Sequence, residues 1–563
     1  MSVANSAGSV PAPKAARPRA GFAVFVAAGI LLSRLSGLVR EKVFAHYFGN
    51  SDAAGVFKAA IRIPNFLQNM LGEGVLSASF IPVYARLLAE GDEELAGRVA
   101  GIVVTLLTLV MAIFVVLGVI FTPALLWAIA PGFKGDIRAL TTLVVRILFP
   151  GIGLLVIYAW CLGIMNSHGK FFLAYVAPVL MNIAMIATMF IFASRMTQTS
   201  LVVALAWGSV VGAALQLGLQ VPFVFRYAKH LKFAIDTTLE PVREVLRNFA
   251  PVVVGRGVVQ LSAYLDNLLA SLLGTGTAAV AGLGYAQTIY LLPISLFGMS
   301  VAAAELPQMS RMIGTEEEIF AGLRKRLERG LRQIAFFVIP SVVAFIAVGK
   351  ALVGALYEGG HFGPADTMFV WYVLIGSTVG MLAATLGRLY SSAFYALRDP
   401  KTPLRFAMLR VALTGALGWI FAIPLRPLML AGLAAIHVPI PVIGGDTAPL
   451  GAIGLTASAG LAGWLEFALL RRALTRRTGA VRIQRSYLVK LWASAILAGV
   501  AGATFFHFVT PALGPHLPHI LPKTRDGMIV CVVYGIVYFV SAMLLGVPEA
   551  RATMGRFLLR SRP

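Results

Sequence analysis

Long apolar runs follow one another along nearly the whole chain, and they constrain the fold more than any other feature of the sequence. A helix needs about 20 residues to cross the hydrocarbon core of a bilayer. Runs of this length predict fourteen membrane-spanning helices, at residues 22–48, 55–82, 98–128, 139–165, 171–194, 200–225, 247–273, 278–307, 333–357, 367–396, 404–424, 447–470, 488–512 and 526–547. Of all residues 13% are charged, against about 25% in soluble proteins. The predicted fold class is therefore all-α, a polytopic membrane protein.

The charged residues are mostly basic, with a formal net charge of +23, and they gather in loops on one side of these helices. Cytoplasmic loops of membrane proteins are enriched in Lys and Arg, so we assign the clusters within 324–332 and 471–485 to the cytoplasm. This orientation places the tails at 1–21 and 548–563, and hence both termini, in the cytoplasm. We exclude nucleic acid as a partner, because no soluble domain is predicted that would present a basic face.

Signatures of enzymes and metal sites are missing from the sequence. It contains no P-loop, HExxH, GxSxG or CxxC motif. The two cysteines, Cys161 and Cys531, lie inside apolar runs, and their number and spacing predict neither a disulfide framework nor a zinc site. We therefore predict a protein that is not an enzyme, binds no metal and needs no cofactor.

A short motif recurs in the two halves of the chain. Pro82-Val-Tyr-Ala-Arg86 ends the second span, and Pro307-Gln-Met-Ser-Arg311 ends the eighth, 225 residues later. Six-helix repeats related by an axis along the membrane normal are a transporter architecture, with the substrate site between the repeats. The alternative is coincidence, since proline and basic residues recur at many helix ends.

The first span carries charged residues within an otherwise apolar helix. Arg34 and Glu41 are seven residues apart and share one helix face, whereas Arg40 lies off that face. Ionisable residues inside a membrane are costly and usually face a cavity or a partner. This segment is therefore a candidate substrate-binding element.

The second span carries a polar stripe. Its members are spaced 4, 3, 4 and 4 residues apart and share one face of a continuous helix, which Pro64 would kink: Lys58, Arg62, Asn65, Asn69 and Glu73. One interpretation is the wall of a cavity that binds an anionic ligand. The other is a ladder of ion pairs, in which Lys58 and Arg62 neutralise Glu41 or Glu73. The two interpretations are compatible.

The second half contributes two charged candidates, both in the seventh span. Arg256 is the candidate cation, and Asp266 is its candidate counter-ion or a cation site. Arginine suits a diphosphate, because its planar fork bonds oxygens in pairs and stays charged when desolvated. Cationic groups midway through helices favour an anionic headgroup over a cationic drug.

Several motifs resemble the signatures of the MurJ/MviN family. They are Ser33-Arg34-Leu-Ser-Gly37-Leu-Val-Arg40-Glu41, Phe48-Gly49, Ile63-Pro64-Asn65, Glu73-Gly74, Phe80-Ile-Pro82 and Phe394-Tyr395-Ala396-Leu-Arg-Asp399-Pro-Lys401-Thr402-Pro403. Members of this family are the lipid II flippases of peptidoglycan synthesis, in the multidrug/oligosaccharidyl-lipid/polysaccharide exporter superfamily. The resemblance implies a V-shaped cationic cavity between six-helix lobes at 22–226 and 227–472. It also implies that two further helices, within 473–547, line a groove for the lipid tail.

The family's charged positions carry over in part. Four of them match: Arg34, Arg40, Glu41 and Arg62. The arginines of the family's second and eighth helices fall at Gln68 and Thr288, and Arg256 is near enough in sequence to compensate. The eleventh span has Thr414 and Gly418 where some members have Asn and Asp.

The resemblance and the residues together predict a flippase. It would move lipid II, an undecaprenyl-diphosphate-linked disaccharide pentapeptide, from the cytoplasmic to the periplasmic leaflet of a bacterial inner membrane by alternating access. The alternatives are an exporter of another lipid-linked oligosaccharide or of a drug, and a non-transporting cell-wall scaffold. The expected partners are lipid II, membrane lipids and other cell-wall synthesis proteins, and the expected oligomeric state is a monomer.

Overall fold

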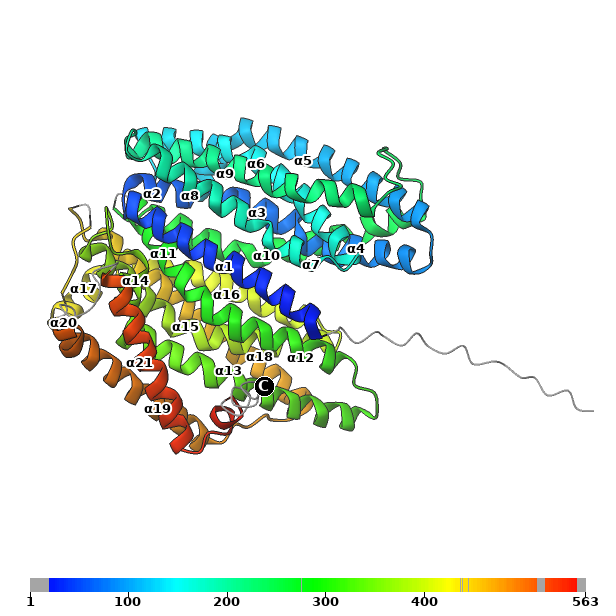
Figure 1. Cartoon of the computed structure of the whole chain (residues 1–563). Coiled ribbons are helices and arrows are strands. Elements are labelled where there is room, and N and C mark those ends of the chain that lie inside the picture. Colours follow the sequence, from blue (N-terminus) through cyan, green and yellow to red (C-terminus); the bar gives the residue numbers. More distant parts are fainter. Residues whose placement is uncertain are drawn as a thin grey trace, which may run out of the picture.

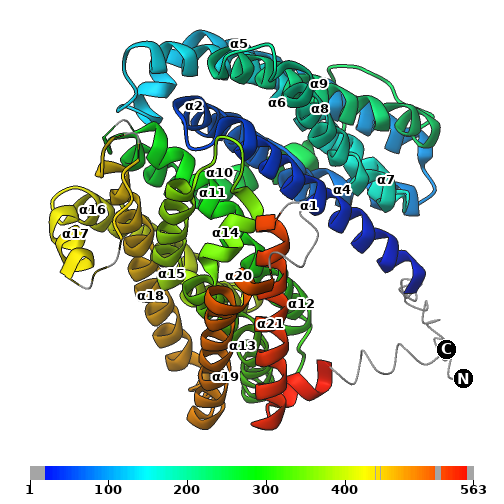
Figure 2. The ribbon, with the colours of Figure 1, turned by 60° about the vertical axis from the view of Figure 1, so that its left-hand side comes forward.

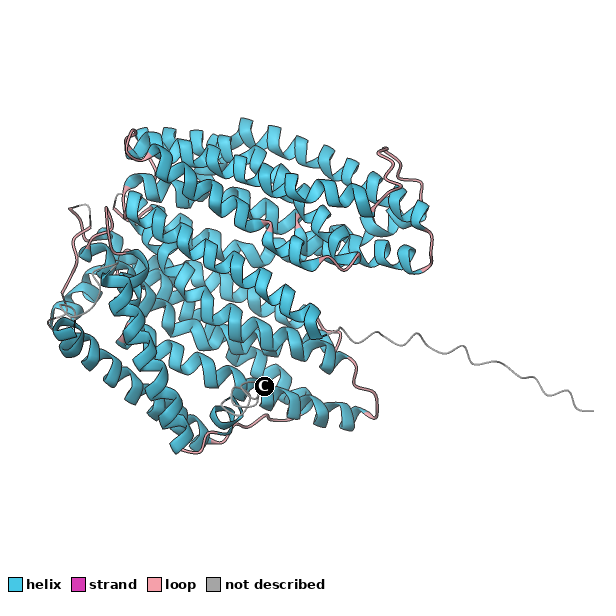
Figure 3. Ribbon diagram, in the orientation of Figure 1, coloured by secondary structure: helices cyan, strands magenta, loops and turns pink. Residues whose placement is uncertain are grey.

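The computed structural model describes residues 20–274, 276–435, 437, 439–443, 445–513 and 522–553. Within these residues the regular elements are helices, joined by short loops (Figure 3). Ten helical stretches are long and apolar enough to cross a membrane. The predicted fold class, an all-α polytopic membrane protein, is therefore confirmed.

The helices follow one another in a single series. Their bounds are α1 Ala20–Phe48, α2 Asp52–Ala60, α3 Arg62–Leu71, α4 Glu73–Ala89, α5 Glu93–Ile129, α6 Gly135–Ser167, α7 Phe171–Val176, α8 Pro178–Phe192, α9 Gln198–Tyr227, α10 Glu240–Ser271, α11 Thr277–Pro293, α12 Ser300–Ser310, α13 Glu316–Ala347, α14 Gly349–Tyr357, α15 Pro364–Ala396, α16 Lys401–Ala422, α17 Arg426–Ala435, α18 Gly451–Thr478, α19 Arg485–Thr504, α20 Thr510–Leu513 and α21 Pro522–Leu544. A π-helical segment, Ile294–Met299, joins α11 to α12, and a second, Phe505–Val509, joins α19 to α20.

Each of the fourteen predicted spans coincides with helical segments, but four of them do not meet the length and hydropathy expected of a span. These four lie at α1, at α2 to α4, at α7 with α8, and at α10. They contain the charged residues of the predicted site or are broken into short helices. The count of fourteen spans stays a prediction.

The second predicted span, 55–82, is not the continuous helix that the stripe assumed. α2 ends at Ala60 and α3 begins at Arg62, because Pro64 has no N–H to bond the carbonyl four residues earlier. Gly72, with φ −90° and ψ −141°, then separates α3 from α4. A β-carbon on Gly72 would lie 2.4 Å from the carbonyl oxygen of Gln68. The stripe is therefore divided among three helices: Lys58 lies on α2, Arg62, Asn65 and Asn69 lie on α3, and Glu73 begins α4. The disturbance predicted at Pro64 is present, and the break at Gly72 was not predicted.

Two groups of helices lie on either side of α1 and α10 (Figures 1 and 2). One contains α5, α6, α8 and α9, and the other contains α11, α13, α15 and α18. α10 contacts both groups, through α3, α4 and α5 on one side and through α16 and α18 on the other. Near the N-terminal end of α10, Glu244 pairs with Arg86 of α4 at 2.6 Å, and this hydrogen bond lowers the pKa of the Glu244 carboxyl.

The C-terminal helices α19 and α21 pack on each other and on α13 and α14 (Figure 2). Tyr538 of α21 donates to the carbonyl of Phe336 at 2.6 Å, and Tyr534 donates to that of Pro340 at 2.7 Å. The Phe336 carbonyl would bond the N–H of residue 340 in a regular helix, and Pro340 has none. The Tyr538 hydroxyl supplies that missing donor and joins α21 to the proline position of α13.

We expect Tyr538→Phe to lower the free energy of unfolding by about 1–3 kcal/mol, since it leaves a buried carbonyl unsatisfied. The measurement is thermal unfolding of the purified protein in detergent. In a Pro340→Ala background the helix provides its own N–H, so the same substitution is expected to have a much smaller effect. Equal losses in the two backgrounds would contradict this account.

Candidate functional site

The first helix is exposed along one side of its middle part. Leu31, Leu35 and Val39 are exposed along one side of α1, and Arg34 is exposed as well. The other side of α1 packs on α7 and α8. Further along the helix, Glu41 is buried. α1 is therefore exposed around Arg34 and buried around Glu41.

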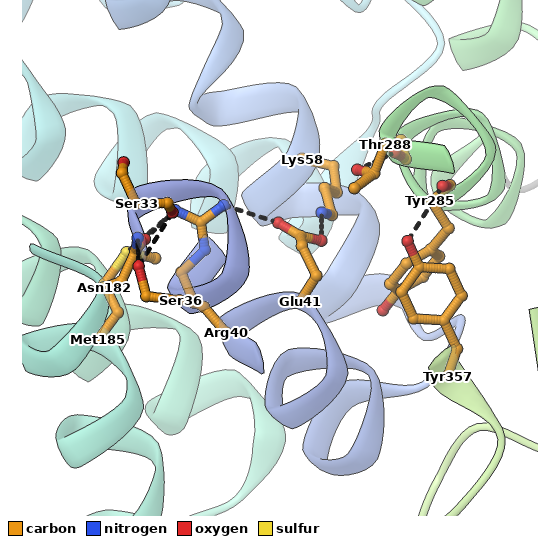
Figure 4. A network of polar contacts seen from close by, with 11 residues as sticks. Ser33, Ser36, Arg40, Glu41, Lys58, Asn182, Met185, Tyr285, Thr288 and Tyr357 are labelled. Atoms are coloured by element: carbon orange, nitrogen blue, oxygen red, sulfur yellow. Dashed lines mark hydrogen bonds and ion pairs between the residues drawn. The ribbon is translucent and has the colours of Figure 1, made fainter. Parts of the chain in front are cut away.

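A cluster of three charged residues lies where α1 meets α2 (Figure 4). Arg40 Nη2 lies 2.9 Å from Glu41 Oε1, and Lys58 Nζ forms an ion pair with Glu41 Oε2. We call these residues the Arg40–Glu41–Lys58 cluster. Its exposure falls from 24% of the Arg40 side chain to 11% for Lys58 and 10% for Glu41. The predicted pairing of Lys58 with Glu41 is thus present, and Arg40 is the member nearest to solvent.

Arg40 is also held by residues that the sequence did not single out. Its Nη1 donates to Asn182 Oδ1 of α8 at 3.0 Å, and Asn182 Nδ2 donates to Ser36 Oγ at 2.8 Å (Figure 4). Asn182 is buried. The one feature of the sequence that could have pointed to it is a polar amide side chain within an otherwise apolar helix. The chain therefore orients the Arg40 guanidinium from two sides before any ligand binds.

The Lys58 side chain is enclosed by aromatic rings. Its Nζ lies 4.9 Å from the ring centre of Phe44 and 5.0 Å from that of Tyr285 on α11. A β-carbon on Gly284 would lie 3.0 Å from Lys58 Cδ, which leaves no room for a larger residue there. Thr288, one turn further along α11, donates to its own helix, to the Gly284 carbonyl at 3.1 Å.

Arg62 lies where α3 meets α10 and α11. Its Nη2 donates to Gln287 Oε1 of α11 at 3.1 Å, and its carbonyl accepts from the Tyr264 hydroxyl of α10 at 2.9 Å. Asp266 lies two residues beyond Tyr264, and its charge interacts with those of Arg62 and Arg410. Its Oδ1 is buried without a hydrogen-bond partner among the described residues. Arg62 and Arg410 are therefore both nearby cations for Asp266.

Arg256 lies on α10, but its side chain is outside the part of the chain that the structure describes. Its predicted role as a second cation toward the cavity stays a prediction. The same holds for its predicted pairing with Asp266.

The remaining stripe residues lie on exposed surface. Asn65, Asn69 and Glu73 are all exposed. Asn69 and Glu73 line a polar hollow of about 380 Å³ together with Gln68, Gly74 and Ser77. The hollow offers amide, hydroxyl and carboxylate groups, which are suited to the hydroxyl and amide groups of a sugar or peptide.

The two groups of helices are joined at the end of α1 and the start of α2. Thr277 of α11 donates to Asp52 at 2.5 Å, and Tyr285 donates to the carbonyl of Gly49 at 2.6 Å. Gly49 has a φ of +58°, and a β-carbon there would lie 2.3 Å from the carbonyl oxygen of His361. Only glycine can adopt this positive φ and also leave room for the His361 carbonyl oxygen without strain. We call these contacts the outer seal, because the predicted orientation would place them on the periplasmic side.

The spacing of these contacts matches the repeated motif. Asp52 and Thr277 are 225 residues apart, and so are Arg62 and Gln287. Two copies related by an axis along the membrane normal would bring equivalent residues together near that axis. Under the predicted repeat, equivalent positions would meet between α2 and α3 on one side and α11 on the other.

Metal ligands do not gather at this site. Within the described ranges no three His, Cys, Asp or Glu side chains lie together as a metal ion would require. The described part of the site consists of arginine and lysine cations, the carboxylates of Glu41 and Asp266, and a polar wall.

The sequence model of a family described as "Lipid II flippase MurJ" matches residues 44–439. A Rhizobium tropici protein named "Probable lipid II flippase MurJ" is 28% identical over 554 residues, covering 96% of each chain. A Burkholderia cenocepacia protein named "Lipid II flippase MurJ" is 28% identical over 458 residues, covering 79% of this chain and 82% of the relative.

Solved structures share the fold. "Lipid II flippase MurJ, inward closed conformation" superposes with a TM-score of 0.71 and 21% identity, covering 92% of this chain and 98% of that one. An inward-facing multidrug resistance transporter of the MATE family superposes with a TM-score of 0.60 and 18% identity, covering 81% and 98%. This chain therefore shares its arrangement of helices with these two solved structures.

Proposed function

Because the chain belongs to the MurJ family of lipid II flippases, we propose that it moves lipid II across the bacterial inner membrane for cell-wall synthesis. It is a multi-pass protein of that membrane. Lipid II carries a diphosphate between its polyprenyl tail and its sugars. The step to be explained is the passage of this charged headgroup through the bilayer interior.

The observation that carries the proposal is Arg40, a guanidinium that Glu41 and Asn182 hold within α1, the first predicted membrane helix. Such a group is costly in a membrane unless a cavity or partner compensates it, and it suits the paired oxygens of a diphosphate. Arg34 and Arg62 would add cationic contacts on either side. The sugars and peptide would meet the wall that bears Asn65, Asn69 and Glu73.

Alternating access would follow from the outer seal. With the N-terminus in the cytoplasm, α1 would run outward, and the seal would lie on the periplasmic side and close it. Release would require α2 to separate from α11 while the lobes close at the cytoplasmic ends. The recurring offset of 225 residues supports two lobes, formed from α1 to α9 and from α10 to α18.

The C-terminal helices would serve the lipid tail. α19 and α21 pack on α13 and α14, and apolar residues on them, such as Val489, Val500 and Met528, are exposed. A polyprenyl chain would lie along this apolar surface while the headgroup crosses. The protein would act as a monomer by transport alone, without forming or breaking a covalent bond.

The test is replacement of the native lipid II flippase in a depleted bacterial host. We expect this chain to restore growth and the outward exposure of lipid II, measured with a periplasmic probe that cleaves it. Growth without lipid II exposure would indicate a scaffold. Failure of both, from protein that reaches the membrane, would indicate a different lipid-linked cargo.

A further inference from the structure

Glu41 is bound by two cations, one on each carboxylate oxygen. Arg40 contacts Oε1 from the more exposed side, and Lys58 contacts Oε2 from the closed side. One carboxylate therefore serves two cations, and the cluster keeps a net charge of +1. The two cations differ in their exposure to solvent: 24% of the Arg40 side chain is exposed, and 11% of the Lys58 side chain.

Lys58 cannot reach an anionic ligand without leaving its place. Its Nζ lies against Phe44 and Tyr285, and its stem packs at Gly284. A cation over aromatic faces gains energy there and loses it on leaving. Lys58 is thus held in its ion pair with Glu41, and its ammonium group does not face the cavity.

We propose that Lys58 is a positioning residue that neutralises Glu41 from the closed side and so keeps the charge of Arg40 available to the phosphates of the cargo. The inference rests on the proposed function, whose cargo is a lipid-linked diphosphate. Without Lys58, both oxygens of Glu41 would be open to Arg40. Arginine and carboxylate readily form such a two-bonded pair. Arg40 would then turn from Asn182 and cargo toward Glu41.

This account predicts that removing Glu41 cancels the effect of removing Lys58. The probe is farnesyl diphosphate, a short prenyl diphosphate, and its affinity for purified wild-type protein, Lys58→Met, Glu41→Gln and the double variant is measured in detergent. We expect Lys58→Met to bind about tenfold more weakly, the scale of one charged hydrogen bond. Glu41→Gln keeps an acceptor for Arg40 but removes the carboxylate charge, so it is expected to bind more tightly than the wild type. The double variant has the same net charge as the wild type in this cluster and is expected to bind about as tightly as the wild type.

Two outcomes would overturn the proposal. If the double variant binds as weakly as Lys58→Met, Lys58 contacts the ligand directly. If Lys58→Met binds like the wild type, Lys58 has no influence on Arg40. Lys58→Gln, which keeps a hydrogen bond to Glu41 but not the charge, is expected to behave like Lys58→Met. If the two Lys58 variants bind the probe equally weakly and unfold at the same temperature as the wild type, the loss of affinity is electrostatic and does not come from misfolding.

The failure of this inference is distinguishable from that of the proposed function. Lipid II exposure by the wild-type chain tests the cargo, and the order of the four affinities tests Lys58. A wild type that binds the prenyl diphosphate but does not expose lipid II would overturn the cargo assignment and leave the role of Lys58 standing.

Discussion

Arg40→Ala is expected to abolish rescue of a flippase-depleted host. The substitution removes the guanidinium of Arg40, which is the most exposed side chain of the Arg40–Glu41–Lys58 cluster. A hydrogen bond to a charged group contributes about 1.5–3 kcal/mol, which corresponds to about 10- to 150-fold in affinity for the headgroup. Glu41 keeps Lys58 as its counter-ion, so the variant is expected to fold. The measurement is lipid II exposure together with growth.

Two further variants make this result specific. Arg195→Ala removes an exposed arginine from the loop after α8 and is expected to leave rescue intact. Arg40→Lys keeps the charge but loses the planar fork, so partial activity is expected. Full lipid II exposure by Arg40→Ala, at wild-type protein levels, would remove Arg40 from the transport path.

A cross-link across the outer seal is expected to stop transport reversibly. Thr277 and Asp52 are hydrogen-bonded at 2.5 Å between α11 and α2. With Cys161 and Cys531 replaced by alanine, the pair Asp52→Cys and Thr277→Cys would be joined by oxidation or by a short bifunctional thiol reagent. The joined protein cannot separate α2 from α11, which outward release requires.

The readout is lipid II exposure before oxidation, after it and after reduction. We expect lipid II exposure before oxidation, its loss to the background level after oxidation, and its recovery after reduction. Each single cysteine variant, treated in the same way, is expected to stay active. Undiminished exposure from fully cross-linked protein would show that release does not pass through the outer seal.

Much of the architecture follows from local pattern. Apolar runs of about 20 residues indicate membrane helices whatever their neighbours, and the described fold bears out the class. The charged residues of α1 were recognisable because ionisable groups inside such runs are rare. Pro64 predicted a disturbance in the second span, but its extent, with a further break at Gly72, depended on packing.

The amino-acid sequence by itself therefore determined the class of fold, the membrane setting, the family and the presence of Arg34, Arg40 and Glu41 on the first helix. The tertiary structure decided which groups meet: Asn182 bonds Arg40 across 142 residues of chain, and Gln287 bonds Arg62 across 225. Helical periodicity repeats every 3.6 residues and says which face a side chain occupies. It contains no information about which distant helix lies against that face, and this is why the enclosure of Lys58 and the outer seal became apparent only in three dimensions.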